Sequence, residues 1–431
     1  MSALARLASD HATVAGSLPV AVVARDGREA ALGVVTALGL PGGREENWRY
    51  TSLRPLDEVR FVPQLSIDAA SVDQARSLLP DPLTGFDRYV FIDGLFADAL
   101  SANPGSARGV SIDTRAPLDA AFGQDGADAR FGALAVAFAP EALSITAAAS
   151  ATRDIEVLFI ATRQGTESAS YPAVTIHAGE HARLRVVERH LGAAHSATFS
   201  NAAIDLQIGS AAQVGHVRVQ QLGAEAIHFE TLRVEIGADA GYTLDTVALG
   251  ARSARTTLHA RLAGHGARIG YAHSVALADT QVNDTYAVIE HAAPGTETTQ
   301  DYRGIAAGRS RVAFNGHVVM RSGAAKSASQ QSLRSLLAGP GAEADVRPQL
   351  EIYTDDVKAS HGATSGKLDE HMLFYLLSRG IERRVAQSLL KWAFLTGLVA
   401  RIAIPALRMQ IERAFAQRFT GEDAAVAQEL V

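Results

Sequence analysis

The chain of 431 residues contains no cysteine. A chain without thiols forms no disulfide, has no cysteine nucleophile and offers no thiolate to a zinc or iron–sulfur site. Aromatic residues make up only 6% while glycine occurs 37 times, a combination that favours a repetitive, thin-walled β architecture. Neither sign of charge dominates, with 40 Lys and Arg against 46 Asp and Glu, which argues against a general nucleic-acid-binding protein.

The chain also lacks a long uninterrupted hydrophobic run. Its most apolar late stretch, residues 389–407, contains Lys391 and Arg401, so it falls short of the roughly 18 to 20 apolar residues that cross a bilayer. Near the N-terminus, Asp10 and His11 interrupt the segment where a secretory signal has its apolar region. We therefore expect a cytoplasmic protein.

A repeated pattern occupies residues 174–273, where four stretches each show an alternating strand, a glycine in a small-residue corner and another strand. The corner glycines are spaced 30, 28 and 27 residues apart. Recurrence near this length predicts stacked coils, with one face of each strand buried and glycine supplying the backbone freedom of a sharp bend. A β-sandwich with evenly spaced hairpins is the alternative. The four glycines are Gly179, Gly209, Gly237 and Gly264.

The pattern of apolar, polar and glycine residues along the sequence predicts three regions. They are a largely helical N-terminal region (1–140), a parallel β-helix core (141–365) and a C-terminal helical domain (366–431). The protein is thus expected to be mainly β, with helical regions flanking a β-helix. Apolar stripes along the C-terminal helices pack on their own domain or contact a partner. The stripe residues that we select as candidate partner contacts are Val385, Leu389, Trp392, Phe394, Leu407, Ile411 and Phe415.

His361 is the most interesting candidate for chemistry, because it follows an expected last strand (348–357) and precedes a glycine-containing turn. A neutral imidazole there could bind a metal, although a hydrogen-bonded loop histidine is the simpler interpretation. Gly366-Lys367 resembles the end of a phosphate-binding loop but lacks the first glycine and the following Ser or Thr. Asp355 and Asp356 allow a polysaccharide-active enzyme, or merely end a strand in solvent.

The region around His361 resembles a known family. Residues 347–364 read RPQLEIYTDDVKASHGAT and residues 373–381 read LFYLLSRGI, which is similar to the SufD branch of the SufB/SufD family of iron–sulfur cluster assembly scaffolds. Weaker matches are NWRYTSL at residues 47–53 and RVAFNG at residues 311–316. Together these segments span most of the chain.

The resemblance implies a β-helix and a non-enzymatic subunit of a SufB–SufC–SufD complex, in which each paralogue carries one SufC ATPase. It implies that His361 takes part in forming the nascent cluster or in binding iron at the SufB interface, and that the C-terminal helices bind SufC. This chain has Ala359 where close relatives often have cysteine, so its share of the ligands depends on His361. We expect no cofactor held by this chain alone.

Two other classes stay open from the residues themselves. One is a β-solenoid enzyme acting on polysaccharides, and the other is a homodimeric structural protein. The isolated chain could also form a homodimer within the scaffold hypothesis. Co-purification with an ATPase would separate the scaffold from both alternatives.

Overall fold

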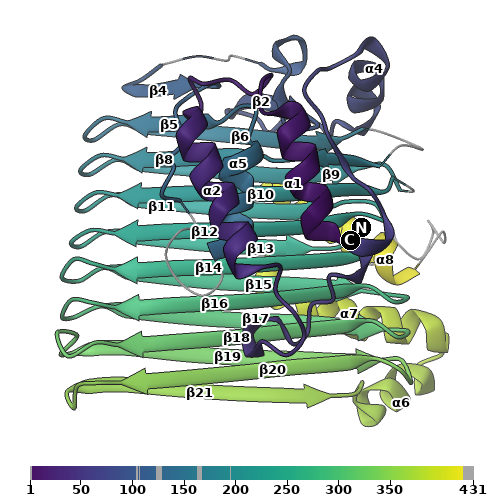
Figure 1. Ribbon diagram of the computed structural model, residues 1–431. Helices are drawn as coiled ribbons and strands as arrows, with labels where there is room; N and C mark the ends of the chain where they lie inside the picture. Colours follow the sequence, from purple (N-terminus) through teal and green to yellow (C-terminus); the bar gives the residue numbers. More distant parts are fainter. Residues whose placement is uncertain are drawn as a thin grey trace.

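The computed structural model describes residues 2–102, 105, 107–122, 129–162, 167–194 and 196–420. Figure 1 shows long strands stacked as successive coils, with the N-terminal coils at the top of the view and the last coil at the bottom. Within the described residues, strands form one sheet of eleven strands and one of ten, and the long strands alternate between them along the chain. Neighbouring long strands of each sheet run parallel, which confirms the β-helix and excludes the hairpin-built sandwich.

One wall of the β-helix is the eleven-stranded sheet. Its long strands pair in parallel, whereas β4 and β5 pair antiparallel at the N-terminal edge. In spatial order its strands are β20 (Glu343–Ile352), β18 (Arg311–Met320), β16 (Val282–His291), β14 (Ser253–Leu262), β12 (Ile227–Ile236), β10 (Thr198–Ile208), β8 (Ala173–Ala178), β5 (Leu143–Ala147) and β4 (Val110–Asp113), with β1 (Val62–Pro63) and β7 (Ser168–Ser170) beside them.

The opposite wall is the ten-stranded sheet, and the apolar core fills the space between the two walls. Its short N-terminal hairpin of β2 and β3 is antiparallel. In spatial order its strands are β21 (Val357–Gly366), β19 (Ser327–Ala338), β17 (Glu297–Ala307), β15 (Arg268–Leu277), β13 (Gly241–Ala248), β11 (Gln213–Gln221), β9 (Arg183–Gly192), β6 (Thr152–Ala161), β2 (Asp87–Ile92) and β3 (Leu95–Phe96).

The pairing register reproduces the spacing of the corner glycines. Arg183 pairs with Gln213 on the next strand of its sheet, 30 residues later. The following steps, to Gly241 and then to Arg268, take 28 and 27 residues. Each repeat in the sequence is therefore one coil of the β-helix.

The corner glycines were expected to supply the backbone freedom of a sharp bend, but the structure shows a different role. A Cβ atom on Gly209 would lie only 2.9 Å from the carbonyl oxygen of Ala178 in the preceding coil. The left-handed residue of this corner comes two positions later, at Ala211, whose φ is 57°. Glycine is therefore required because stacked coils approach closely, and the bend itself is made by the residue after next.

N-terminal helices cover the outer face of the eleven-stranded sheet (Figure 1). Trp48 and Phe131 pack together with ring centroids 5.1 Å apart, and Phe131 meets Phe229 of β12 at 4.8 Å. Strands β2 and β4 lie before residue 141, and they pair with β6 and β5 of the β-helix. The division of the chain into three regions at residues 140 and 365 stays a prediction. The helical elements are α1 (Ala3–Val14), α2 (Arg25–Leu38), η1 (Glu46–Trp48), α3 (Arg54–Glu58), α4 (Ala69–Leu78), η2 (Asp98–Leu100) and α5 (Ala129–Phe138).

Three C-terminal helices, α6 (Glu370–Ser378), α7 (Arg383–Val399) and α8 (Pro405–Thr420), lie on the other side of the molecule (Figure 1). Helices α7 and α8 pack against the outer face of the ten-stranded sheet, where Leu395 and Phe415 join a buried cluster with Val217 and Val247. The predicted residues 421–431 of the helical domain lie outside the described residues. Among the described helices, none combines the length and apolar character that a membrane span needs.

Candidate functional site

His361 lies in the middle of β21, the last strand of the β-helix. It pairs with Gln331 of β19, a residue whose side chain is buried inside the coil. Side chains opposite one another in parallel strands share a face, so His361 lies on the interior face of the last coil. The end of the β-helix is open beside β21, and His361 is therefore exposed.

The predicted turn at His361 was wrong, because residues 357–366 form a strand. Pairing with β19 continues through Gly362 and up to Gly366, so the preceding coil determines the conformation of this glycine-containing segment. The predicted last strand (348–357) instead contains the end of β20 and the turn that leads into β21. Ala359 pairs with Ser329 and shares the interior face with His361.

A column of polar side chains continues inward from His361. Going back along the sheet, the residues in register with it are Gln331, Gln300 and Tyr271, which are all buried. The Gln331 side-chain amide donates hydrogen bonds to the Gly316 carbonyl at 2.9 Å and to Gln300 at 3.3 Å. The exposed imidazole at the end of the β-helix is thus continuous with a polar strip in its interior.

The other acidic and basic candidates do not form a site. Asp355 and Asp356 are exposed in the turn between β20 and β21, where the Asp356 carbonyl accepts a hydrogen bond from the Lys326 N–H. Gly366 ends β21, and Lys367 lies in the connection to α6. This placement gives no support to a phosphate-binding loop or to a paired-carboxylate site.

The C-terminal candidates divide into two groups by burial. Leu407, Ile411 and Phe415 are at most 2% exposed and hold α8 on the β-helix, so their side chains offer no free surface. The remaining four are only partly buried and leave some of their surface exposed. They are Val385, Leu389, Trp392 and Phe394.

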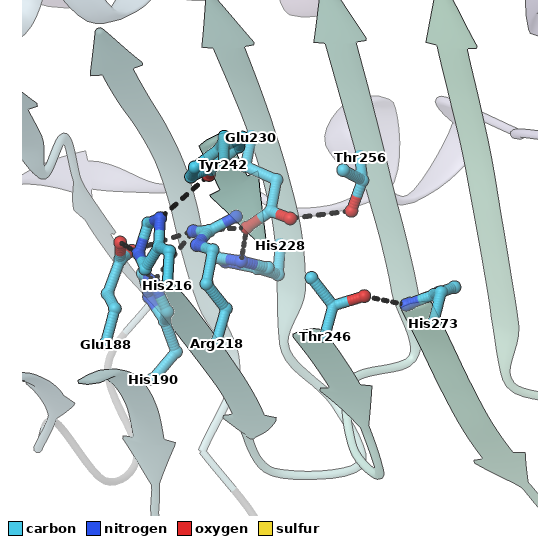
Figure 2. A network of polar contacts seen from close by, with 10 residues as sticks. All are labelled: Glu188, His190, His216, Arg218, His228, Glu230, Tyr242, Thr246, Thr256 and His273. Atoms are coloured by element: carbon cyan, nitrogen blue, oxygen red, sulfur yellow. Dashed lines mark hydrogen bonds and ion pairs between the residues drawn. The ribbon is translucent and has the colours of Figure 1, made fainter. Parts of the chain in front are cut away.

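A polar network lies inside the β-helix, and Figure 2 shows how its side chains converge. It is built from pairs of residues two apart on one strand, which point to the same face. Strand β9 contributes Glu188 and His190, and β11 contributes His216 and Arg218. The third pair, His228 and Glu230, comes from β12 in the opposite wall.

Glu188 accepts hydrogen bonds from three partners. These are His190 Nε2 at 2.6 Å, His216 Nε2 at 3.2 Å and Arg218 Nη2 at 2.7 Å. The same guanidinium contacts Glu230 Oε2 at 2.8 Å, so Arg218 bridges the carboxylates of the two walls. All of these side chains are buried, and the network is therefore shielded from solvent.

Further hydrogen bonds orient Glu230. His228 Nε2 donates to its Oε2 at 2.9 Å, and the Thr256 hydroxyl donates to its Oε1 at 2.6 Å. A neighbouring hydrogen bond links Thr246 to His273 (Figure 2). His273 Nε2 also lies 3.2 Å from Asn283 Oδ1. The carboxylate is thus held by groups from three different coils.

Burial and charge determine the protonation of this network. Burial opposes ionisation of Glu188, but Arg218 and the two neighbouring histidines hold its pKa well below the ordinary value. The pKa of Glu230 is also lowered, since Arg218 and His228 outweigh the opposing effect of burial. Burial lowers the pKa of His190 to about 4 and that of His216 below its ordinary value. At neutral pH two carboxylates therefore face one guanidinium and neutral His190 and His216.

Sequence reasoning missed this network, although a signal was present. Leu184 and Val186 point into the core, and the same alternation carries Glu188 and His190 inward. The intervening residue Val187 is apolar as well, because its outer face is covered by the C-terminal helices. Every second residue of this strand points inward from Leu184 onward. Counting on from Leu184 and Val186 would therefore have placed Glu188 and His190 inside, although both faces of the strand carry apolar residues.

The architecture and these two sites define a β-helix protein that presents imidazole and carboxylate groups without a thiol. A family model described as the SUF system FeS cluster assembly SufBD core domain matches residues 159–394. The chain belongs to this family, whose members serve iron–sulfur cluster assembly. It is 30% identical over 406 residues to the iron–sulfur cluster assembly protein SufD of Escherichia coli K12, covering 89% of this chain and 90% of that protein.

Two further relatives carry the same family description. A SufBD family protein of Synechocystis is 26% identical over 407 residues, covering 90% of this chain and 89% of the relative. A SufBD family protein of Mycobacterium bovis is 25% identical over 393 residues, covering 88% and 89%. The likeness to each of these three relatives thus covers about nine tenths of the chain.

Proposed function

We propose that this protein is the SufD-type, non-catalytic subunit of a SufB–SufC–SufD scaffold, and that His361 supplies a ligand to iron or to the nascent cluster at the contact with SufB. The observation that carries the proposal is the position of His361 on the interior face of the last, open coil. Because the chain has no cysteine, thiolate ligands come from the partner. ATP hydrolysis belongs to SufC, and the cluster is the cargo of the complex.

The open end of the β-helix suits a partner of the same architecture. Within the described residues, β20 and β21 are edge strands, each paired on one side only. An unpaired strand edge presents backbone donors and acceptors to another chain. Ile352 and Tyr353 are exposed beside this edge, which adds apolar area to the proposed SufB contact.

The C-terminal helices support the docking of SufC. On α6, the large side chains of Met372, Phe374 and Tyr375 are more than half exposed, and Phe374 reaches 71%. Exposed apolar side chains gathered on one short helix favour a protein contact. Together with the partly buried Trp392 of α7 they form the proposed SufC surface, while α8 holds this surface on the β-helix.

Reconstitution of the complex with SufB and SufC tests both parts of the proposal. The His361→Ala complex should assemble normally but hold less iron and acid-labile sulfide than the unchanged complex. The matched control is His265→Ala, which removes an exposed imidazole in the turn between β14 and β15, away from both proposed contacts. The Phe374→Ser variant should retain SufB and lose SufC during size-exclusion chromatography. Full cluster content in the His361→Ala complex would refute the ligand role, and retention of SufC by Phe374→Ser would refute the docking surface.

A further inference from the structure

We propose that His190, His228 and Glu230 form a binding site for a divalent transition-metal ion inside the β-helix. One ligand atom from each residue lies within 4.8 Å of the other two, and all three side chains are buried. They come from facing walls, since β9 carries His190 and β12 carries the other two. The site is separate from His361, which lies several coils away on β21.

The three side chains border a small cavity in which an ion fits. The cavity has a volume of about 20 Å³ and is also lined by Arg218, Thr246, Thr256 and other buried residues. A space of this size holds about one water molecule or one metal ion. The interior therefore needs no rearrangement of its strands to accommodate the ion.

One ring nitrogen of His190 and one of His228 are placed to act as ligands. His228 Nε2 lies 2.9 Å from Glu230 Oε2, and in the other tautomer of the neutral ring the proton sits on the buried Nδ1, which has no hydrogen-bond partner, so that Nε2 can bind an ion beside the carboxylate. His190 donates its Nε2 proton to Glu188, the carboxylate–histidine arrangement that orients metal-binding imidazoles.

The charges of the network favour an added cation. Glu188 and Glu230 carry two negative charges, and Arg218, which contacts both, compensates one of them. A divalent ion at Glu230 would more than compensate the remaining negative charge while Arg218 keeps its 2.7 Å contact with Glu188. Two imidazoles and one carboxylate are suitable ligands for Zn²⁺, Fe²⁺ or Co²⁺.

Arg218 also sets a limit on affinity, because the ion has to displace its contact with Glu230 Oε2. We therefore expect a site that exchanges its metal rather than one that holds it permanently. The Thr256 hydroxyl keeps the other carboxylate oxygen in place during this exchange. Removing that hydroxyl should weaken binding by roughly tenfold, as expected for a residue that orients a ligand.

Co²⁺ binding to the full-length chain tests the site, with His361→Ala as the starting protein so that the proposed interface ligand does not contribute. This protein, treated with a chelator and dialysed, should bind one equivalent of Co²⁺ in calorimetry and show visible absorption bands. Adding Glu230→Gln or His190→Gln should weaken that binding at least tenfold. Far-UV circular dichroism verifies that each variant is folded.

Two outcomes of the binding measurement would overturn the inference. One is the absence of stoichiometric Co²⁺ binding to the folded His361→Ala protein, and the other is unchanged affinity in the folded Glu230→Gln or His190→Gln protein. Crystals of the His361→Ala protein grown with Co²⁺ provide a test that needs no further variant. An anomalous-scattering peak between His190, His228 and Glu230 is expected, and a peak only elsewhere would equally refute the site. Neither measurement depends on cluster assembly, so it can fail while the proposed function stands.

Discussion

Removing the charge of Arg218 should destabilise this protein strongly. It bridges Glu188 and Glu230 at 2.7 and 2.8 Å, and its side chain is only 4% exposed. The Arg218→Gln substitution leaves two buried carboxylates without their cation. Removing one partner of a buried ion pair costs about 3–5 kcal/mol, because the remaining charge is neither solvated nor paired.

An independent calculation gives the same magnitude. Without Arg218, the network can relax by binding a proton at one carboxyl, whose ordinary pKa is 4.5. Neutralising such a group at pH 7 costs about 3.4 kcal/mol, at 1.36 kcal/mol for each pH unit. The folded variant then binds more protons than its unfolded chain, so its stability should fall as the pH rises. Its deficit relative to the unchanged protein should grow by about 1.4 kcal/mol per unit between pH 5 and 7.

Urea denaturation followed by circular dichroism measures this deficit. The Arg218→Gln/Glu230→Gln double variant should be more stable than Arg218→Gln alone, because it removes one of the two uncompensated charges. Arg185→Gln is the matched control, since Arg185 pairs with Asp154 on the surface and such pairs contribute about 1 kcal/mol or less. A cost below 1 kcal/mol for Arg218→Gln, or a double variant no more stable than it, would refute this account of the charges.

Two other predictions concern the coils, one for a buried histidine and one for a corner glycine. Burial lowers the pKa of His273 to about 4, so the unfolded chain, with a pKa of 6.5, takes up the proton first as the pH falls. The stability that His273 contributes is thus complete above pH 6.5 and declines by about 3 kcal/mol toward pH 4. The His273→Asn substitution should therefore make the urea midpoint of unfolding depend less steeply on pH. An unchanged slope would contradict this prediction. Gly264→Ala would place its Cβ 2.0 Å from the Ala238 nitrogen, whereas Gly362→Ala meets no atom within 4 Å. The first should lower the melting temperature strongly and the second very little, and equal melting temperatures would contradict the close stacking of the coils.

The sequence was sufficient for the fold because the coils repeat in it. The spacing from Gly179 to Gly264 equals the pairing register, which is a direct consequence of stacking one coil on another. The conformation of residues 357–366 was not predictable locally, since it depends on pairing with β19 across some 30 residues. The stripe at Leu407 and Phe415 showed that one face of α8 is covered, but a stripe does not identify the surface that covers it.

The interior network is not required by the β-helix itself. In the column that contains His216, the neighbouring coils place Val186 and Leu244 at the same position, and both are buried in the apolar core. A coil filled with apolar side chains is therefore compatible with this architecture, and replacing buried ion pairs by apolar residues is often neutral or stabilising. The charged residues instead hold imidazole and carboxylate groups in a fixed arrangement. In a chain without thiols these are the side-chain groups suited to binding iron or similar ions, which is why we assign the network a role in metal binding rather than in folding.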